Sequence, residues 1–81
     1  MTRERAVELL LGEASSLARG NMYANDDHPP IDPIHGLMRR EIHDGTAYLN
    51  AVDLARRFGI SPTELRTRLG QRLIDTVSKA A

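Results

Sequence analysis

The sequence contains no cysteine and no tryptophan, and its aromatic side chains are limited to two tyrosines and one phenylalanine. Without cysteine the chain forms no disulfide, thiolate nucleophile or cysteine-based zinc site. With so few aromatic residues, the core must be built from leucine, isoleucine, valine and alanine, which is typical of helices packing on helices. We therefore expect an all-α fold in a reducing compartment, by default the cytoplasm.

Long hydrophobic runs and enzyme motifs are also missing. Residues 1–5 are too charged for a signal peptide, and the apolar run that follows is too short to span a membrane. The chain has no glycine-rich phosphate loop, nucleophile elbow or zinc-binding helix pair. We therefore expect a binding protein that needs no cofactor and is not an enzyme.

Residue types that bind metal ions do gather between positions 26 and 35: Asp26, Asp27, His28, Asp32 and His35. Calcium loops need oxygen ligands that alternate around a glycine turn, and zinc-binding helices need two histidines one turn apart. Neither pattern is present, so we expect no metal site. These carboxylates could instead shield or mimic phosphate if the partner is itself a nucleic-acid-binding protein.

The net charge of zero conceals an asymmetry between the two parts of the chain. Residues 1–35 carry three arginines and six carboxylates, a net charge of −3. Residues 36–81 carry eight basic and five acidic side chains, a net charge of +3. The later part is modestly basic, and arginine, whose planar fork suits phosphate and carboxylate, supplies nearly all of its positive charge.

Residues 1–20 have the apolar spacing of an amphipathic helix, with Thr2 as its N-cap. This helix either covers the core of its own domain or pairs with a second copy in a homodimer. The residues that would form the dimer interface are Val7, Leu10, Leu11, Ala14 and Leu17.

The middle of the chain alternates between breaks and ordered segments. Residues 21–32 are acidic and proline-rich and predict a loop. Asp32 and Pro33 then start a second helix over residues 33–43, which stops at the turn signal of Asp44 and Gly45. Residues 46–49 are the only extended-looking stretch, so we expect at most a very short strand near 47–49.

Two more helices are predicted over residues 50–58 and 62–78. Asn50 is a good N-cap for the first, and Gly59 ends it in the left-handed conformation that glycine adopts cheaply. Ser61 and Pro62 start the second, and Glu64 is placed to complete a capping box. The sequence therefore predicts a single domain, a small bundle of about four helices over residues 1–81.

Residues 50–69 resemble the helix-turn-helix of bacterial DNA-binding proteins. That pattern has a small residue in the first helix, a glycine four positions later, an apolar residue directly after the glycine, and another apolar residue five positions further on. In this sequence these positions hold Ala55, Gly59, Ile60 and Leu65. One departure is Arg68, where the family usually has an apolar or small residue. The preceding stretch also resembles a winged helix, but no strand-like run follows position 69, so we expect no full wing.

The resemblance implies double-stranded DNA as the partner and assigns roles to six side chains. The start of the second helix would enter the major groove and present Ser61, Thr63, Arg66 and Thr67. The end of the first helix would place Arg56 and Arg57 near the phosphate backbone. Of the groove-facing residues, arginine alone can bind guanine through two hydrogen bonds.

Other functions fit the same residues. The chain could be a transcriptional regulator or accessory protein that binds DNA. It could instead be an interaction or adaptor protein, for example a phage or mobile-element accessory factor, that uses the same helices without binding nucleic acid. A third possibility is one module of a larger assembly, with residues 1–20 as its oligomerisation helix.

Overall fold

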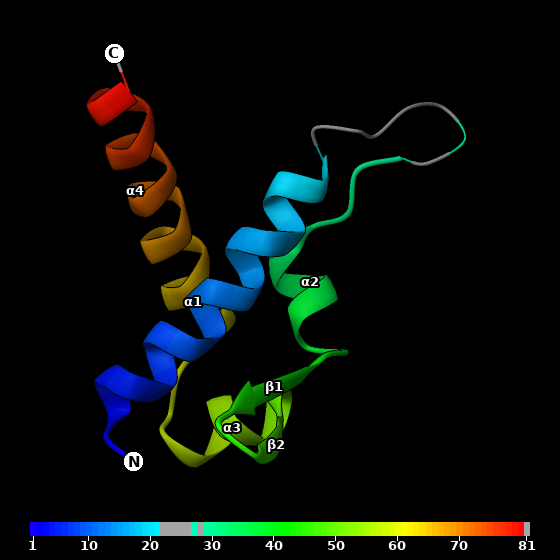
Figure 1. Cartoon of the computed structure of the whole chain (residues 1–81), viewed down its shortest axis with the longest axis vertical. Coiled ribbons are helices and arrows are strands. Elements are labelled where there is room, and N and C mark those ends of the chain that lie inside the picture. Colours follow the sequence, from blue (N-terminus) through cyan, green and yellow to red (C-terminus); the bar gives the residue numbers. More distant parts are fainter. Residues whose placement is uncertain (22–26, 28, 81) are drawn as a thin grey trace.

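The structure is a computed structural model that describes residues 1–21, 27 and 29–80, and only the backbone of residues 76–80. The described part contains four helices and two strands (Figure 1). In chain order they are α1 (Arg3–Gly20), α2 (Pro33–Leu37), β1 (Glu41–Asp44), β2 (Ala47–Asn50), α3 (Ala51–Arg57) and α4 (Pro62–Ala80). Of the predicted loop over 21–32, residues 22–26 and 28 lie outside the described residues.

The prediction of an all-α fold is wrong, because β1 and β2 form an antiparallel hairpin between α2 and α3. Asp44 pairs with Ala47, so the hairpin closes through a two-residue loop, Gly45 and Thr46. Gly45 has a φ of 65°. A glycine with positive φ at the first loop position is the requirement of a type II′ turn, which matches the twist of the flanking strands.

The predicted second helix over 33–43 is therefore wrong in its later part. α2 does begin at Pro33 with Asp32 as its N-cap, but it ends at Leu37. The chain then turns, and Ile42 reaches the core from β1 with only 4% of its surface exposed. Ile42 lies eight positions after Ile34, which is a spacing that would place both on one face of a helix. In the structure both side chains reach the core, Ile34 from a short helix and Ile42 from the strand that follows.

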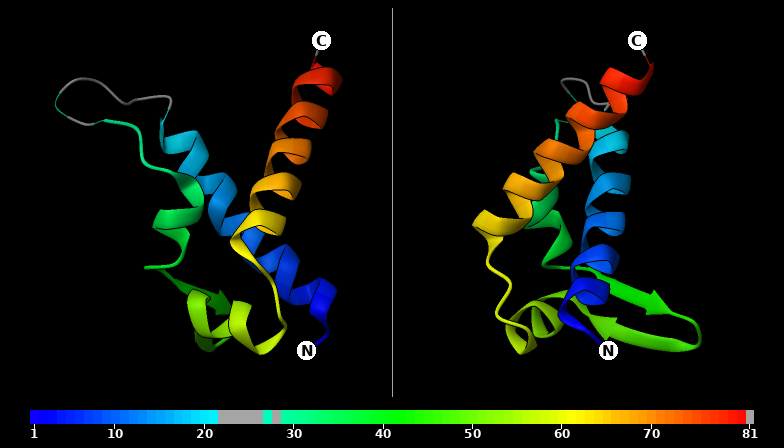
Figure 2. Two further views of the ribbon diagram at one scale, coloured as in Figure 1. Left: turned by 180° about the vertical axis from the view of Figure 1, so that it is seen from behind. Right: turned by 90° about the vertical axis from the view of Figure 1, so that its left-hand side faces the viewer.

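The helix α1 is the central element of the core. Thr2 caps it by accepting a hydrogen bond from the Arg5 N–H at 3.1 Å, as predicted. Its inward face packs against α2, α3, α4 and β1, which surround it (Figures 1 and 2). The core is aliphatic, as the composition implies, and its buried members are Ala6, Val7, Leu10, Leu11, Ala14, Ile34, Leu37, Ile42, Ala51, Leu54, Ala55, Ile60, Leu65 and Leu69.

The predicted corner between the last two helices is present. Asn50 caps α3 through hydrogen bonds from two backbone N–H groups. Gly59 has a φ of 62°, and the N–H of Ile60 bonds to the carbonyl of Ala55 at 2.9 Å. Ile60, 4% exposed, then fills the corner, and the Ser61 hydroxyl accepts a hydrogen bond from the Glu64 N–H at 3.1 Å.

Helix α4 runs in the same general direction as α1 and diverges from it towards the C-terminal end in the left view of Figure 2. The second part of α4 therefore projects away from the core, and Leu73 and Ile74 are 39% and 61% exposed. Within the part of the chain that the structure describes, no helix combines the length and the apolar character needed to cross a membrane.

Candidate nucleic-acid interface

The start of α4 presents a polar outer face and an apolar inner face. Leu65 is fully buried and Leu69 is 6% exposed, so both point into the core. The four side chains predicted to face the DNA groove, Ser61, Thr63, Arg66 and Thr67, are all exposed. The structure thus brings these four residues together on the accessible side of α4.

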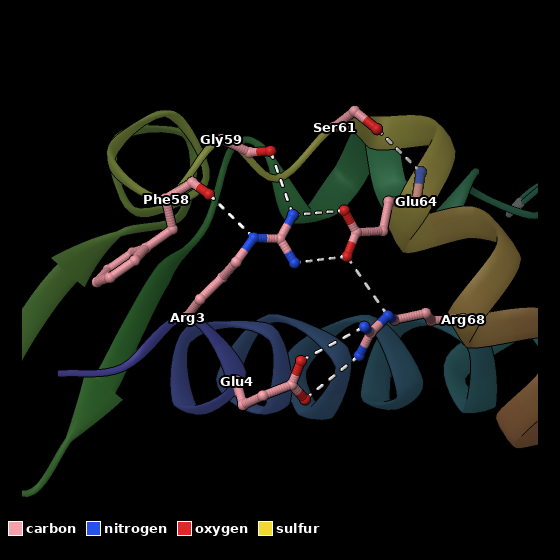
Figure 3. A network of polar contacts seen from close by, with 7 residues as sticks. All are labelled: Arg3, Glu4, Phe58, Gly59, Ser61, Glu64 and Arg68. Atoms are coloured by element: carbon pink, nitrogen blue, oxygen red, sulfur yellow. Dashed lines mark hydrogen bonds and ion pairs between the residues drawn. The ribbon is translucent and has the colours of Figure 1, made fainter.

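Arg3 holds the corner that orients this face, as Figure 3 shows. Its Nε donates to the carbonyl of Phe58 at 3.2 Å, and one terminal nitrogen donates to the carbonyl of Gly59 at 3.3 Å. Its two terminal nitrogens also bond to the two carboxylate oxygens of Glu64, at 2.6 and 2.8 Å. One side chain from α1 therefore connects the end of α3, the corner and the first turn of α4.

The carboxylate of Glu64 is engaged by two arginines. The hydrogen bonds from Arg3 lower the pKa of the Glu64 carboxyl below its usual value, and the charges of Arg3 and Arg68 lower it further. Arg68 lies 3.4 Å from the same carboxylate (Figure 3). Glu64 does not return to the Ser61 N–H, so only one half of the predicted capping box forms. Its negative charge is compensated locally, which limits its repulsion of a phosphate backbone.

Arg66, the residue predicted to read guanine, forms an ion pair within the molecule. Its terminal nitrogen lies 3.0 Å from the Asp32 carboxylate, and both side chains remain about half exposed. The other oxygen of Asp32 accepts the capping hydrogen bond from the Ile34 N–H at 3.0 Å. These contacts, that of Arg66 first, lower the pKa of the Asp32 carboxyl. A carboxylate thus occupies one of the positions that a phosphate or guanine would take.

Two further arginines of α4 pair with α1. Arg68 lies 3.4 Å from the carboxylate of Glu4, and Arg72 lies 2.8 Å from that of Glu8. Both pairs have the same sequence separation of 64 positions. The two helices therefore run in the same direction where they meet, and Arg68 and Arg72 of α4 lie on the side towards α1 while remaining partly exposed.

The two arginines at the end of α3 differ in their surroundings. Arg57 lies over the ring of Phe58, 5.5 Å from its centre, which is a cation–π geometry. Arg56 is exposed and takes part in no ion pair with any described residue. Arg56 is thus available for a phosphate, and Arg57 is partly fixed by the aromatic ring.

The residues expected at a dimer interface are placed in the chain's own core. Val7, Leu10, Leu11 and Ala14 are at most 3% exposed, and Leu17 is half-buried against the core. A dimer built on these residues would require the core to open. The homodimer itself stays a prediction, but this face of α1 is occupied by α2, α3 and α4.

Of the residues considered as metal ligands, Asp26 and His28 lie outside the described residues. Asp32 is committed to the cap of α2 and to Arg66. Across residues 1–21, 27 and 29–80, no group of three or more histidine and carboxylate side chains could hold a metal ion.

Sequence reasoning did not find the Arg3 clamp or the Asp32–Arg66 pair. The opposite net charge of the two parts of the chain was a signal for the Asp32–Arg66 pair only, because Arg3 and Glu64 each have the charge opposite to the net charge of their own part. Comparison of the chain with protein-family models, curated proteins and solved structures gives no match.

Proposed function

We propose that this protein binds double-stranded DNA through α3 and α4, as a transcriptional regulator or accessory protein. The observation that carries the proposal is the corner at Gly59, which exposes Ser61, Thr63, Arg66 and Thr67 along the start of α4. This start is the part of a helix-turn-helix that enters the major groove. Arg56, exposed on the preceding helix, is suited to a backbone phosphate.

The electrostatics favour modest affinity and few phosphate contacts. The chain has no net charge, and Arg3, Arg68 and Arg72 are paired with carboxylates. Because non-specific binding scales with the number of phosphates neutralised, we expect a shallow dependence of affinity on salt, with a slope near −0.9 for each contact. Binding in the cytoplasm, where such regulators work, is part of the same proposal.

The test measures retention of the protein on random duplex DNA at increasing salt, and then on a duplex selected from a random library. Arg66→Ala should weaken binding to the selected duplex by about 1 to 3 kcal/mol. Arg56→Ala should weaken binding to both duplexes alike and reduce the salt slope by about one. The matched control is Arg19→Ala, which removes an exposed arginine at the far end of α1.

A protein partner is the second candidate, and the internal pairing of the α4 arginines favours it. Arg66, Arg68 and Arg72 each contact a carboxylate, and the side chains of Leu73 and Ile74 lie exposed farther along the same helix. An adaptor that uses α4 against another protein would have such a surface. Absence of retention on DNA at any salt, including very low salt, would reject the DNA proposal and leave this one.

A further inference from the structure

A concave groove lies between α1 and β1, away from the exposed start of α4. Its volume is about 460 Å³. From α1 it is lined by Glu8, Leu9, Gly12 and Glu13, and from the other side by the consecutive residues 40–43. Because β1 contributes a continuous stretch and β2 contributes nothing to this lining, the groove lies along the outer edge of β1.

The hydrogen-bonding pattern of the hairpin shows which backbone groups face this groove. The Ala51 N–H bonds to the Arg40 carbonyl at 3.0 Å, so residues 40 and 51 form a hydrogen-bonded pair. Such pairs alternate along an antiparallel ladder. Ile42 and Asp44 are therefore bonded to β2, and the N–H and C=O groups of Glu41 and His43 point away from it.

This outer edge has no backbone partner in the described part of the chain. The backbone N–H and C=O groups of Glu41 and His43 form no hydrogen bond with any described residue outside the hairpin, and within the hairpin they point away from β2. Figure 2 shows the hairpin extending sideways from α1, with β1 as the strand nearer to the body of that helix. A free strand edge next to a groove is the arrangement in which an extended peptide adds as a further strand.

Gly12 gives the groove its open floor. It lies in the interior of α1, where glycine lowers helix stability relative to alanine. Its φ is not positive, and a Cβ atom at this position would meet nothing within 4 Å. Neither the backbone conformation nor the packing of this chain therefore requires a glycine there. The space beside Gly12 is thus open to a bound chain.

The side chains around the groove define the chemistry of its occupant. Ile42 is buried and Asp44 contacts Arg5 of α1, so these two side chains of β1 face the helix. Glu41 and His43 lie on the opposite face, where the His43 ring packs against Tyr48. An added strand would place alternate side chains over Leu9 and Gly12, and the others beside Glu41.

The charge of the groove is acidic. Three carboxylates line it, those of Glu8, Glu13 and Glu41, and that of Glu8 also pairs with Arg72 of α4 at 2.8 Å. Arg40 is the one arginine in the lining, which holds no lysine, and it lies 3.8 Å from Glu13. Glu41 forms no ion pair with any described residue. Basic side chains are therefore expected at alternate positions of the occupant, with apolar side chains between them.

A second copy of β1 is a poor occupant. The strand Glu41–Asp44 carries two carboxylates and no arginine or lysine. Pairing it with itself would bring like charges into opposite or neighbouring positions, which destabilises a sheet. The acidic strand therefore disfavours self-association and favours a chain of opposite charge.

From these observations we propose that the outer edge of β1 and the adjacent face of α1 bind an extended peptide with alternating basic and apolar side chains. The peptide forms backbone hydrogen bonds with Glu41 and His43, places its apolar side chains against Leu9 and Gly12, and places its basic side chains near Glu41. This site is independent of the proposed DNA contacts and stands if they fail.

To test this, the full chain is titrated with a capped peptide of alternating lysine and valine. Binding is measured by fluorescence anisotropy and by amide hydrogen exchange. Binding should slow exchange of the Glu41 and His43 amides and leave those of Ile42 and Asp44 unchanged. Gly12→Leu, which fills the groove and removes a helix-weakening glycine, should raise Tm and lower the affinity by at least about tenfold. Glu41→Lys should lower the affinity for the peptide severalfold, because it reverses the charge beside the bound lysines.

Two control peptides separate strand addition from simple charge attraction. In one peptide the backbone amide nitrogens of the lysines are N-methylated. In the other, the backbone amide nitrogens of the valines are N-methylated. A peptide paired with β1 uses only one alternate set of its amides, so one control should bind and the other should not. Equal binding of both controls, unchanged affinity of Gly12→Leu, or no binding up to about 1 mM would overturn the proposal. So would protection of the Glu41 and His43 amides by self-association of the free protein.

Discussion

At the scale of single residues, arginine–carboxylate pairs connect segments that are far apart in the sequence. Arg3 is the clearest case, because its guanidinium binds two backbone carbonyls at the α3–α4 corner as well as the carboxylate of Glu64. Asp32 is similar on a smaller scale, because one oxygen caps α2 and the other binds Arg66. Each of these two side chains therefore holds a backbone turn through hydrogen bonds and also pairs with a side chain of opposite charge.

The lowered pKa of Glu64 predicts a pH dependence of stability. A carboxyl whose pKa falls on folding stabilises the native state above its ordinary value of 4.5 and loses this contribution as pH falls through the folded value. Glu64→Gln, which cannot ionise, should therefore have a lower Tm than the wild type at neutral pH. The difference should shrink as pH falls below 4.5 in thermal melts. A constant difference down to about pH 2 would show that the charge of Glu64 is not responsible.

Asp32→Asn should increase affinity for DNA. Asparagine is as good an N-cap as aspartate, so α2 keeps its start, while the charge that holds Arg66 is removed. Freed from an exposed ion pair, Arg66 should bind DNA about two- to fivefold more tightly in a duplex titration, since such pairs are weak. The matched control is Asp53→Asn, which removes a carboxylate from the first turn of α3 instead. An equal gain in that control would indicate only a general effect of charge.

At the scale of elements, the sequence predicts those with local signals at both ends. Thr2, Asn50 and Gly59 act within a few residues of themselves, and in the structure Thr2 caps α1, Asn50 caps α3 and Gly59 turns the chain after α3. The hairpin was missed because Ile34, Leu37 and Ile42 fit a helical face as well as a helix followed by a strand. Gly45, followed by a threonine and flanked by β-branched and aromatic residues, was the signal available for it.

The glycines at 59 and 70 should respond oppositely to replacement by alanine. At Gly59, φ is 62° and a Cβ would meet nothing within 4 Å, so the cost comes from the backbone, about 1 to 2 kcal/mol. At Gly70, within α4, a Cβ also meets nothing, and alanine should stabilise the helix by up to about 1 kcal/mol. Urea denaturation of both variants checks this. Destabilisation by both would mean that Gly70 marks a required kink.

At the scale of the whole molecule, the opposite charges of the two parts of the chain are used in contacts between them. Acidic side chains of α1 and the segment before α2 pair with arginines of α4, in line with this asymmetry. Two arginines of α1 pair with Glu64 and Asp44 in the opposite sense. The sequence predicts the asymmetry but not the pairing. Which carboxylate meets which arginine depends on how α1 and α4 cross, and local sequence signals carry no information about that crossing.

Salt should therefore reduce the stability of the fold. Raising sodium chloride from about 0.01 to about 0.5 M shortens the Debye length several-fold and screens these exposed pairs, so Tm should fall by a few degrees. The double variant with Glu4→Gln and Glu8→Gln lacks two of the pairs and should lose less. Thermal melts of both proteins make the comparison, and an equal fall in Tm would argue against a role for these carboxylates.

The position of Arg3 also bears on how the protein is made. The ribosome adds Arg3 61 positions before Glu64, and the two side chains meet only in the folded chain. During synthesis, the contact between Arg3 and the α3–α4 corner cannot form until Glu64 has emerged from the ribosome. The surface proposed to bind DNA is consequently completed only after Glu64 has been added.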